Sequence, residues 1–271
     1  MAPLLMDNLD LMSRPVNYLS YQIQVKDGKK HHVQLYLEAA PNWALNSPAQ
    51  DAVSRSFRSG NLQFVKTGSK SQQILEKKGD DLRIDWGYFY MAGNAAKTKS
   101  IVGNSQELRV KFLKNEHTLP SKEGKQLALI QTFDVSSSYQ DKILLGYDDL
   151  YSIQYFEQNL RPYWNTNGNN TIEKQFELAD KEYAALKKAA DKFDAELWST
   201  ALRNGGEDYA ALCALAYRQA IAAHKLVKAP NGDLLLLSKE NDSNGSIGTV
   251  DVTYPSAPIF LYYNPALAKG L

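Results

Sequence analysis

The spacing of apolar residues changes once along this chain, near residue 148, and this change constrains the fold more than any other feature of the sequence. Before it, apolar and polar residues alternate in short runs, as they do in half-buried β-strands. After it, apolar residues recur every three or four positions, as they do on one face of an α-helix. We therefore expect two domains, an antiparallel β-sandwich followed by a helical domain.

The clearest alternation lies near the start of the chain. It runs from Leu19 to Val25 and resumes from Val33 to Leu37, and Asp27-Gly28 between the two runs is typical of a tight turn. These residues predict a hairpin over 16–39. Further strands are predicted at 62–66, 82–90, 108–112, 127–135 and 143–146. These strands follow one another at short intervals and are separated by polar turns, which favours antiparallel pairing.

Helical spacing begins directly after the last predicted strand. Leu150, Ile153, Phe156 and Leu160 are three or four residues apart, which predicts a short connecting helix that ends at Arg161-Pro162. The polar run that follows has the composition of a linker.

A long amphipathic helix is then predicted from Ile172 to Trp198, with Thr171 as its N-cap. Asn204-Gly205-Gly206 interrupts it, and a second helix is predicted over 209–223. Two helices joined by a short glycine turn form an αα-hairpin, the repeat unit of a toroid. Such a hairpin cannot bury both of its faces, so we expect exposed apolar patches here, or packing against the sandwich or another copy.

Composition excludes several classes of function. Lys and Arg total 31 against 30 acidic residues, and a net charge of +1 does not attract nucleic acid or an anionic membrane. The apolar runs are far shorter than the roughly 20 residues that a membrane-spanning helix needs, and no signal peptide is recognisable after Met1. Cys213 is the single cysteine, which excludes an intrachain disulfide. No metal-binding motif occurs, so we expect no cofactor and no metal.

The segment 238–263 is the best place to look for a site. It combines carboxylates with turn residues such as Asn244-Gly245 and Gly248. Pro255 and Pro258 predict an extended piece that does not continue a helix. Loops collect such residues for purely structural reasons as well, so local composition leaves both interpretations open.

Glu240 and Asp251 are the catalytic candidates on this segment, because two carboxylates can divide acid and base roles when the fold separates their pKa values. In the alternative interpretation, Glu240 pairs with a nearby cation and Asp251 caps a turn. Arg218, Asn241 and Tyr254 are the candidates for substrate binding. An arginine can hold a substrate carboxylate with two hydrogen bonds, although it can equally pair with a local acid.

Three stretches carry a resemblance that spreads from residue 7 to residue 271. They are DNLDLMSRPVNYLSYQIQ, RNGGEDYAALCALAYRQAIAAHKL and KENDSNGSIGTVDVTYPSAPIFLYYNPALAKGL, and the TVDVTYPSAP run within the last is the most distinctive. The chain resembles the glutaminase A family. The resemblance implies a secreted or periplasmic amidohydrolase that converts L-glutamine to L-glutamate and ammonia, with an N-terminal β-rich domain and a six-hairpin α/α toroid.

The resemblance also implies a domain division. Residues 1–148 correspond to the N-terminal β-rich domain, 149–170 to a connecting helix and linker, and 171–271 to the start of the toroid. Family members extend further in both directions, so we expect this chain to be an internal fragment, and its activity by itself is left open.

Two alternative functions have the same architecture. A sandwich joined to an α/α toroid is also found in glycoside hydrolases, and a fragment of this kind could serve as a carbohydrate-binding module. The chain contains 16 tyrosines and 4 tryptophans, which suit either a sugar-binding cleft or an ordinary β core. Aromatic residues in a shallow exposed groove would favour sugar, whereas a small closed pocket with one arginine and one carboxylate would favour glutamine. In each case the partner is a small molecule, and the oligomeric state is not predicted.

Overall fold

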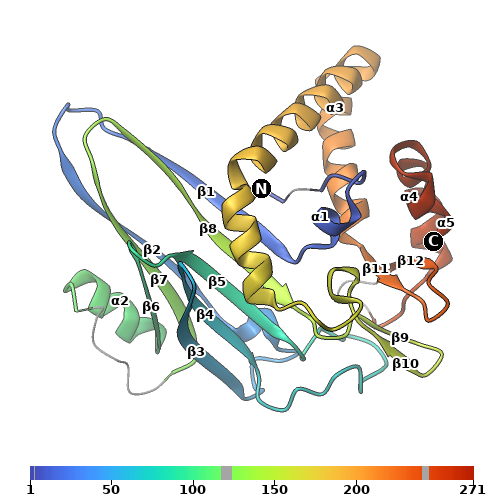
Figure 1. The fold of residues 1–271 in the computed structure, drawn as a ribbon, viewed down its shortest axis with the longest axis horizontal. Coiled ribbons are helices and arrows are strands. Elements are labelled where there is room, and N and C mark those ends of the chain that lie inside the picture. Colours follow the sequence, from blue (N-terminus) through green and yellow to red (C-terminus); the bar gives the residue numbers. More distant parts are fainter. Residues whose placement is uncertain (3, 117–123, 240–243) are drawn as a thin grey trace.

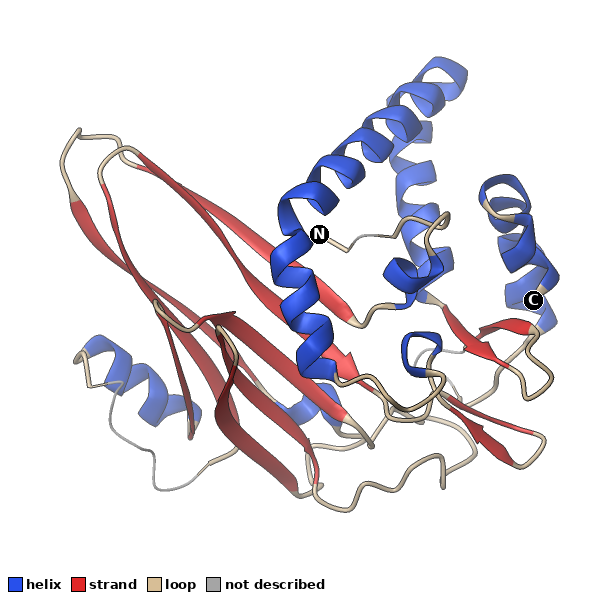
Figure 2. Cartoon of the chain, in the orientation of Figure 1, coloured by secondary structure: helices blue, strands red, loops and turns tan. Residues whose placement is uncertain are grey.

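The computed structural model describes residues 1–2, 4–116, 124–239 and 244–271. Its strands gather into a twisted β-rich region, and the long helices lie together beside it (Figure 1). The same division is visible when helices and strands are coloured separately (Figure 2). The chain therefore has the predicted β-then-α organisation.

Two antiparallel sheets form the β-rich region. The larger sheet contains, in spatial order, β1 (Val16–Gln24), β8 (Ser138–Asp148), β5 (Tyr88–Asn94), β4 (Leu62–Ser69) and β3 (Ala52–Ser59). The smaller sheet contains, in order, β2 (His31–Ala39), β7 (Gln126–Val135) and β6 (Thr98–Gly103), and the short 3-10 helix η1 (Pro41–Ala44) follows β2 in the chain. The strands predicted at 62–66, 127–135 and 143–146 lie within β4, β7 and β8.

The two sheets share one core. Val65 and Met91 of the larger sheet and Leu127 and Leu129 of the smaller sheet are all at most 1% exposed and belong to the same apolar cluster. Alternating side chains of each sheet thus face the other sheet, as in an antiparallel sandwich. This confirms the predicted β-sandwich.

The predicted hairpin over 16–39 is wrong in its pairing, although both of its strands exist. β1 pairs with β8, so that Val16 lies opposite Gly146, and β2 pairs with β7, so that Ala39 lies opposite Leu127. The chain crosses from one sheet to the other between β1 and β2. Alternation indicates that one face of a strand is buried, and this holds whichever strand is its neighbour.

The strand predicted at 108–112 is also wrong, because these residues belong to the helix α2 (Ser105–Leu113). The side chain of Asn104 accepts a backbone hydrogen bond in the first turn and caps the helix. Leu108 is fully buried against the smaller sheet, and Phe112, one helical turn later, packs on the same cluster. Their spacing of four fits a helix as well as a strand.

The strand predicted at 82–90 begins only at Tyr88. Gly87 has φ = +77°, and its backbone lies against the carbonyl of Asp148 so closely that a Cβ atom would not fit. The chain bends at this glycine before it enters β5. The preceding residues, including Trp86, consequently leave the sheet and reach the helical part of the molecule.

A small β-hairpin replaces the helix predicted between residues 150 and 160. β9 (Ile153–Tyr155) pairs with β10 (Gln158–Leu160), and Phe156 and Glu157 between them have φ = 43° and 64°. Positive φ at both positions is the geometry of a two-residue hairpin turn. The predicted connecting helix within 149–170 is therefore wrong.

The long helix α3 (Ile172–Ala222) follows the short 3-10 helix η2 (Tyr163–Asn165). Thr171 caps its start, as predicted, by accepting a hydrogen bond from the backbone of the first turn at 3.3 Å. Gly206 interrupts it with φ = 81° and ψ = −173°, and the helix divides there into two arms that form a hairpin (Figure 1). This confirms the predicted αα-hairpin and its glycine break.

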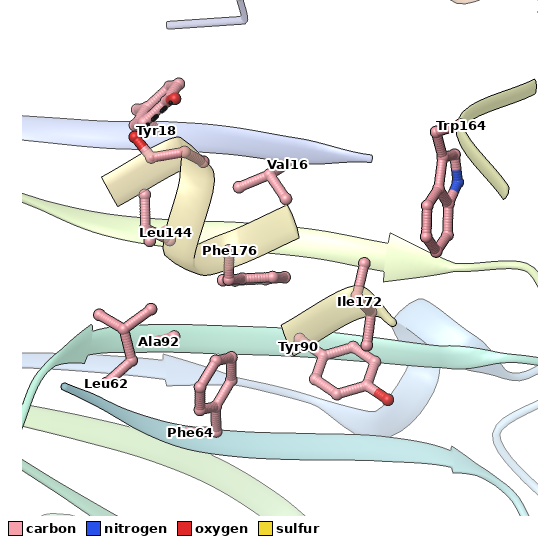
Figure 3. Packing of buried hydrophobic residues seen from close by; sticks show 11 residues of the cluster. Val16, Tyr18, Leu62, Phe64, Tyr90, Ala92, Leu144, Trp164, Ile172 and Phe176 are labelled. Atoms are coloured by element: carbon pink, nitrogen blue, oxygen red, sulfur yellow. Dashed lines mark hydrogen bonds between the residues drawn. The ribbon is translucent and has the colours of Figure 1, made fainter. Parts of the chain in front are cut away.

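The first arm of α3 covers the outer face of the larger sheet. Phe176 is fully buried there, and its ring centroid lies 5.3 Å from that of Phe64 and 6.0 Å from that of Tyr90 (Figure 3). The hydroxyl of Tyr18 on β1 donates a hydrogen bond to the carbonyl of Ala179 at 3.0 Å. Burial of a side chain such as Phe176 contributes about 2–3 kcal/mol, so these contacts hold the helix firmly on the sandwich.

The last part of the chain completes the helical side. It contains β11 (His224–Lys228), β12 (Leu234–Ser238), α4 (Val250–Tyr263) and α5 (Pro265–Lys269). The helix α1 (Leu9–Ser13) also lies here, and Met6 before it belongs to the same core as Tyr217 of α3 and Phe260 of α4.

The extended piece predicted around Pro255 and Pro258 is wrong, because both prolines lie inside α4. Each proline removes one helical hydrogen bond to the carbonyl four residues earlier. Those carbonyls belong to Asp251 and Tyr254, which are exposed, so water can satisfy them. The hydroxyl of Ser256 adds a bond to a helix carbonyl at 2.9 Å.

Large apolar side chains are exposed on the helical side, as predicted for a hairpin that cannot bury both of its faces. They lie on α3 and α4 and are Trp198, Leu202, Tyr209, Leu212, Leu215, Val250, Tyr254, Leu261 and Tyr262. Among the described residues, no helix combines the length and the apolar character needed to span a bilayer.

Candidate functional site

A cavity of about 680 Å³ lies between the loop that joins β4 to β5, the β9–β10 hairpin and the chain that follows β12. One wall is the irregular segment that precedes β5, which includes Asp85 and Trp86. The β9–β10 hairpin contributes Gln154 and Asn159, and the chain after β12 contributes Lys239. Three segments distant in sequence thus converge on one space.

Trp86 forms a rigid wall of this cavity. It is 8% exposed, and its indole Nε1 donates hydrogen bonds to the carbonyls of Asp149 and Tyr151 at 2.8 and 2.9 Å. Both bonds exist because Gly87 turns the chain away from the sheet. The indole ring therefore cannot reorient without losing buried hydrogen bonds.

Asp149 lies directly after β8 and carries a buried charge beside the cavity. It is 3% exposed, and its Oδ2 accepts hydrogen bonds from Lys225 Nζ at 2.9 Å and from Ser152 Oγ at 2.7 Å. Burial opposes ionisation of this carboxyl, but the Lys225 ammonium and the Ser152 hydroxyl outweigh it and lower the pKa of Asp149. The group is therefore an anion at neutral pH.

Asp85 is a second buried acid on the cavity wall, with 1% exposure. Its Oδ2 accepts hydrogen bonds from Lys77 Nζ and, at 2.9 Å, from Gln50 Nε2. A buried carboxylate requires such partners, since an unpaired one would be costly. Asp85 is thus held in place at the wall of the cavity.

Lys239 brings a positive charge to the cavity from the end of β12. Its Nζ lies 5.5 Å from the centre of the Trp86 ring. Burial, followed by repulsion from Lys225, lowers the pKa of Lys239 to about 8, although Asp149 acts in the opposite direction. Within the described part of the chain, no acceptor hydrogen-bonds to this amine. Lys239 therefore exchanges a proton near neutral pH more readily than an ordinary lysine.

The cavity presents groups of both charge signs together with the side-chain amides of Gln154, Asn159 and Asn244. Gln154 Nε2 donates to Asn159 Oδ1 at 3.2 Å on the β9–β10 hairpin. Such a set can bind a small zwitterion, with cations toward its carboxylate and anions toward its ammonium group. Among the described residues, no group of three or more His, Cys, Asp or Glu side chains is arranged to hold a metal ion.

The predicted site segment reaches this cavity only at its beginning. Lys239, Asn244 and Ile247 line the cavity, whereas the candidates Glu240 and Asn241 lie outside the described residues. Asp251 is exposed in the first turn of α4, and Tyr254 is 82% exposed on the same helix. Neither of these two side chains lines the cavity.

Arg218 is exposed on the second arm of α3 and lines a different cavity of about 900 Å³. That space lies between the two arms of α3 and the first residues of the chain, and Trp198 and Tyr217 also line it. The structure therefore does not bring Arg218 together with Asp251 and Tyr254. The catalytic and binding roles of all five predicted residues stay predictions.

Sequence reasoning did not select Asp85, Trp86, Asp149 or Lys225. Asp149 looked like a turn residue, and Asp85 and Trp86 looked like members of a strand. Nothing in local spacing relates Asp85-Trp86 to Asp149 or Lys225, because these three places lie far apart along the chain. The one available indication was Lys239, which lies inside the selected segment 238–263.

Two family models match the chain. A domain of unknown function (DUF5127) matches residues 1–200, and the glutaminase A six helical-hairpin domain matches residues 206–271. The two models meet close to Gly206, where α3 divides into its two arms.

Two curated proteins are similar over nearly the whole chain. Glutaminase A of Aspergillus oryzae is 25% identical over 287 residues, which cover 99% of this chain and 41% of that protein. A protein of Arthroderma benhamiae named as a probable glutaminase is 23% identical over 283 residues, which cover 93% of this chain and 32% of that protein. The chain thus spans well under half the length of either relative.

Proposed function

Because the chain belongs to the glutaminase A-like family, we propose that it is part of an amidohydrolase that converts L-glutamine to L-glutamate and ammonia. We place substrate binding in the cavity between Asp85, Trp86 and Lys239. The observation that carries this proposal is the presence of buried groups of opposite charge on one cavity wall, at the junction of the two matched domains.

The charges of the cavity suit an amino acid. L-Glutamine carries an α-carboxylate and an α-ammonium group, and a site for it needs a cation and an anion a few ångströms apart. The Lys77–Asp85 pair provides charges of both signs at the cavity wall. The side-chain amides of Gln154 and Asn159 offer hydrogen bonds to the substrate's own amide.

The sugar alternative fits this cavity less well. Sugar sites commonly use exposed aromatic rings in a shallow groove, whereas Trp86 is 8% exposed and lies among charged side chains. The exposed tyrosines Tyr254 and Tyr262 lie on α4 and do not line the cavity. The arrangement therefore supports an amino acid over a carbohydrate.

Ammonia release from L-glutamine by the 271-residue chain tests the proposal. Substitution Asp85→Asn removes one charge of the cavity and should raise KM for glutamine by at least tenfold. Asp233→Asn, an exposed carboxylate on the β11–β12 turn, is the matched control and should leave KM unchanged. Glu240→Gln and Asp251→Asn test the two predicted catalytic carboxylates in the same assay.

Absence of ammonia release, together with release of sugar from an oligosaccharide panel, would replace the glutaminase proposal with the glycoside hydrolase alternative. Binding of an oligosaccharide without hydrolysis would favour a carbohydrate-binding module. Location in the periplasm or outside the cell, and the domain boundaries at residues 148 and 170, stay predictions.

A further inference from the structure

Asp85 on the cavity wall and Asp149 beside the cavity are buried carboxylates, and each already has its own hydrogen-bond donors. Asp149 accepts hydrogen bonds from Lys225 at 2.9 Å and from Ser152 at 2.7 Å. Asp85 accepts them from Lys77 and Gln50. Both buried carboxylates are therefore already engaged, and neither hydrogen-bonds to Lys239.

Lys239 differs from Lys77 and Lys225, which pair with these two carboxylates. Its amine faces the Trp86 ring at 5.5 Å, at the wall of the cavity, and no described residue accepts a hydrogen bond from it. An ammonium group in this position loses hydration without gaining a carboxylate partner, whereas a neutral amine loses little. The position of Lys239 therefore favours the neutral amine over the ammonium form, and a neutral amine can accept a proton.

We propose that Lys239 is the proton acceptor of this cavity, an inference that rests on the proposed amide hydrolysis and assigns one step of it. Neutral Lys239 removes a proton from a water molecule as the water oxygen forms a bond to the amide carbonyl carbon. The resulting ammonium returns that proton to the departing nitrogen as the carbon–nitrogen bond breaks. Water and the amide are consumed, the acid and ammonia are formed, and the lysine is regenerated.

Neighbouring charges support this role. Lys225 on β11 repels a second positive charge, and Asp149 at the end of β8 attracts one, but Asp149 is largely neutralised by Lys225. The remaining charged groups on the cavity wall belong to the segment before β5 and are Glu76, Lys77, Lys78, Arg83 and Asp85. The lowered pKa of Lys239, about 8, agrees with this balance.

Competitive acetylation tests the protonation state without any substrate. The folded chain is treated with trace acetic anhydride from pH 6 to 11, and mass spectrometry gives the labelling rate of each lysine. Lys239 should reach half of its limiting rate near pH 8, whereas ordinary lysines reach it near pH 10.4. Exposed Lys192 on α3 is the internal reference. A midpoint for Lys239 equal to that of Lys192 would overturn the inference.

A variant at Lys225 tests the origin of the effect. Lys225→Gln removes the repelling charge but keeps a hydrogen-bond donor for Asp149, so the protein should stay folded. The midpoint of Lys239 should then move toward the ordinary value, and its labelling at pH 8 should fall several-fold. An unchanged midpoint in a folded variant would contradict the proposed arrangement.

Measurements of ammonia release distinguish two roles of Lys239, a proton acceptor and a fixed positive charge. Lys239→Arg keeps the positive charge but does not deprotonate, so ammonia release should fall about 10²–10⁴-fold, as it should in Lys239→Met. Full activity of Lys239→Arg would overturn the inference while leaving the proposed function intact. If the unaltered chain releases no ammonia, the proposed function fails, and the acetylation midpoint still decides whether Lys239 is a proton-accepting amine.

Discussion

Lys225 Nζ and Asp149 Oδ2 lie 2.9 Å apart and join the β11–β12 hairpin to the end of the last strand of the sandwich. The Asp149 side chain is 4% exposed and that of Lys225 is 37% exposed. One carboxylate thus connects the two regions and shapes the electrostatics of the cavity between them.

Lys225→Met should destabilise the protein by about 2 kcal/mol, because it leaves the buried Asp149 carboxylate without its cation. The partial exposure of Lys225 keeps the cost below that of a fully buried pair. Urea unfolding followed by circular dichroism measures it. Lys192→Met, at the exposed pair with Glu196, should cost less than about 0.5 kcal/mol. Equal costs at the two positions would show that the Lys225–Asp149 contact is not a buried ion pair in solution.

Lys239 should make stability depend on pH in the alkaline range. Its pKa in the folded protein is about 8, below the ordinary lysine value of roughly 10.4. Between these values the unfolded chain binds more protons than the folded protein, so stability from this group rises with pH. Below pH 8 the cost of the buried ammonium is fully present.

The free energy of unfolding of the unaltered chain, minus that of Lys239→Met, should therefore increase from pH 7 to pH 10. Urea titrations at three pH values measure this difference, and Lys192→Met corrects for the loss of one lysine. A difference that stays constant or decreases with pH would contradict the lowered pKa of Lys239.

Gly206→Ala should destabilise the helical hairpin by about 1–3 kcal/mol. The backbone there has φ = 81° and ψ = −173°, a conformation that is nearly restricted to glycine. A Cβ atom would meet no neighbour within 4 Å, so the whole cost is backbone strain. Thermal unfolding measures the effect, and Arg203→Ala on the preceding exposed turn should leave the melting temperature nearly unchanged. If Gly206→Ala left the melting temperature unchanged, the backbone between the two arms of α3 would have a different conformation in solution.

Leu212→Gln combined with Leu261→Gln should reduce self-association without reducing stability. Both side chains are 60% exposed, one on α3 and the other on α4, so their removal creates no internal cavity. Sedimentation velocity over a concentration series should show less association than in the unaltered chain. Leu226→Gln, at a buried position in the same region, is the contrasting variant and should unfold the protein. Equal sedimentation of the double variant and the unaltered chain would show that this surface does not mediate contacts between copies.

Local sequence determined much of the architecture of this protein. Alternation located most strands of the sandwich, although not β3 or β6, while Thr171 identified the start of the long helix and Gly206 identified its break. These features depend on backbone preferences and on which face of an element is buried, and both are encoded within a few neighbouring residues.

Other features were decided only by tertiary structure. The strand at 16–24 pairs with 138–148 rather than with its neighbour at 31–39, because burial of one face does not specify the adjacent strand. Residues 105–113 and 250–263 form helices despite alternating residues in the first and two prolines in the second. In each case packing against the rest of the protein outweighed the local pattern.

The cavity shows most clearly which features depend on local sequence and which depend on tertiary structure. The sequence directed attention to the segment that begins at Ser238, and Lys239 in that segment does line the cavity. Its partners Trp86, Asp149 and Lys225 come from other parts of the chain. The charges of Asp149 and Lys225 act on Lys239 only because folding buries these side chains near one another, and no pattern along the chain contains that proximity.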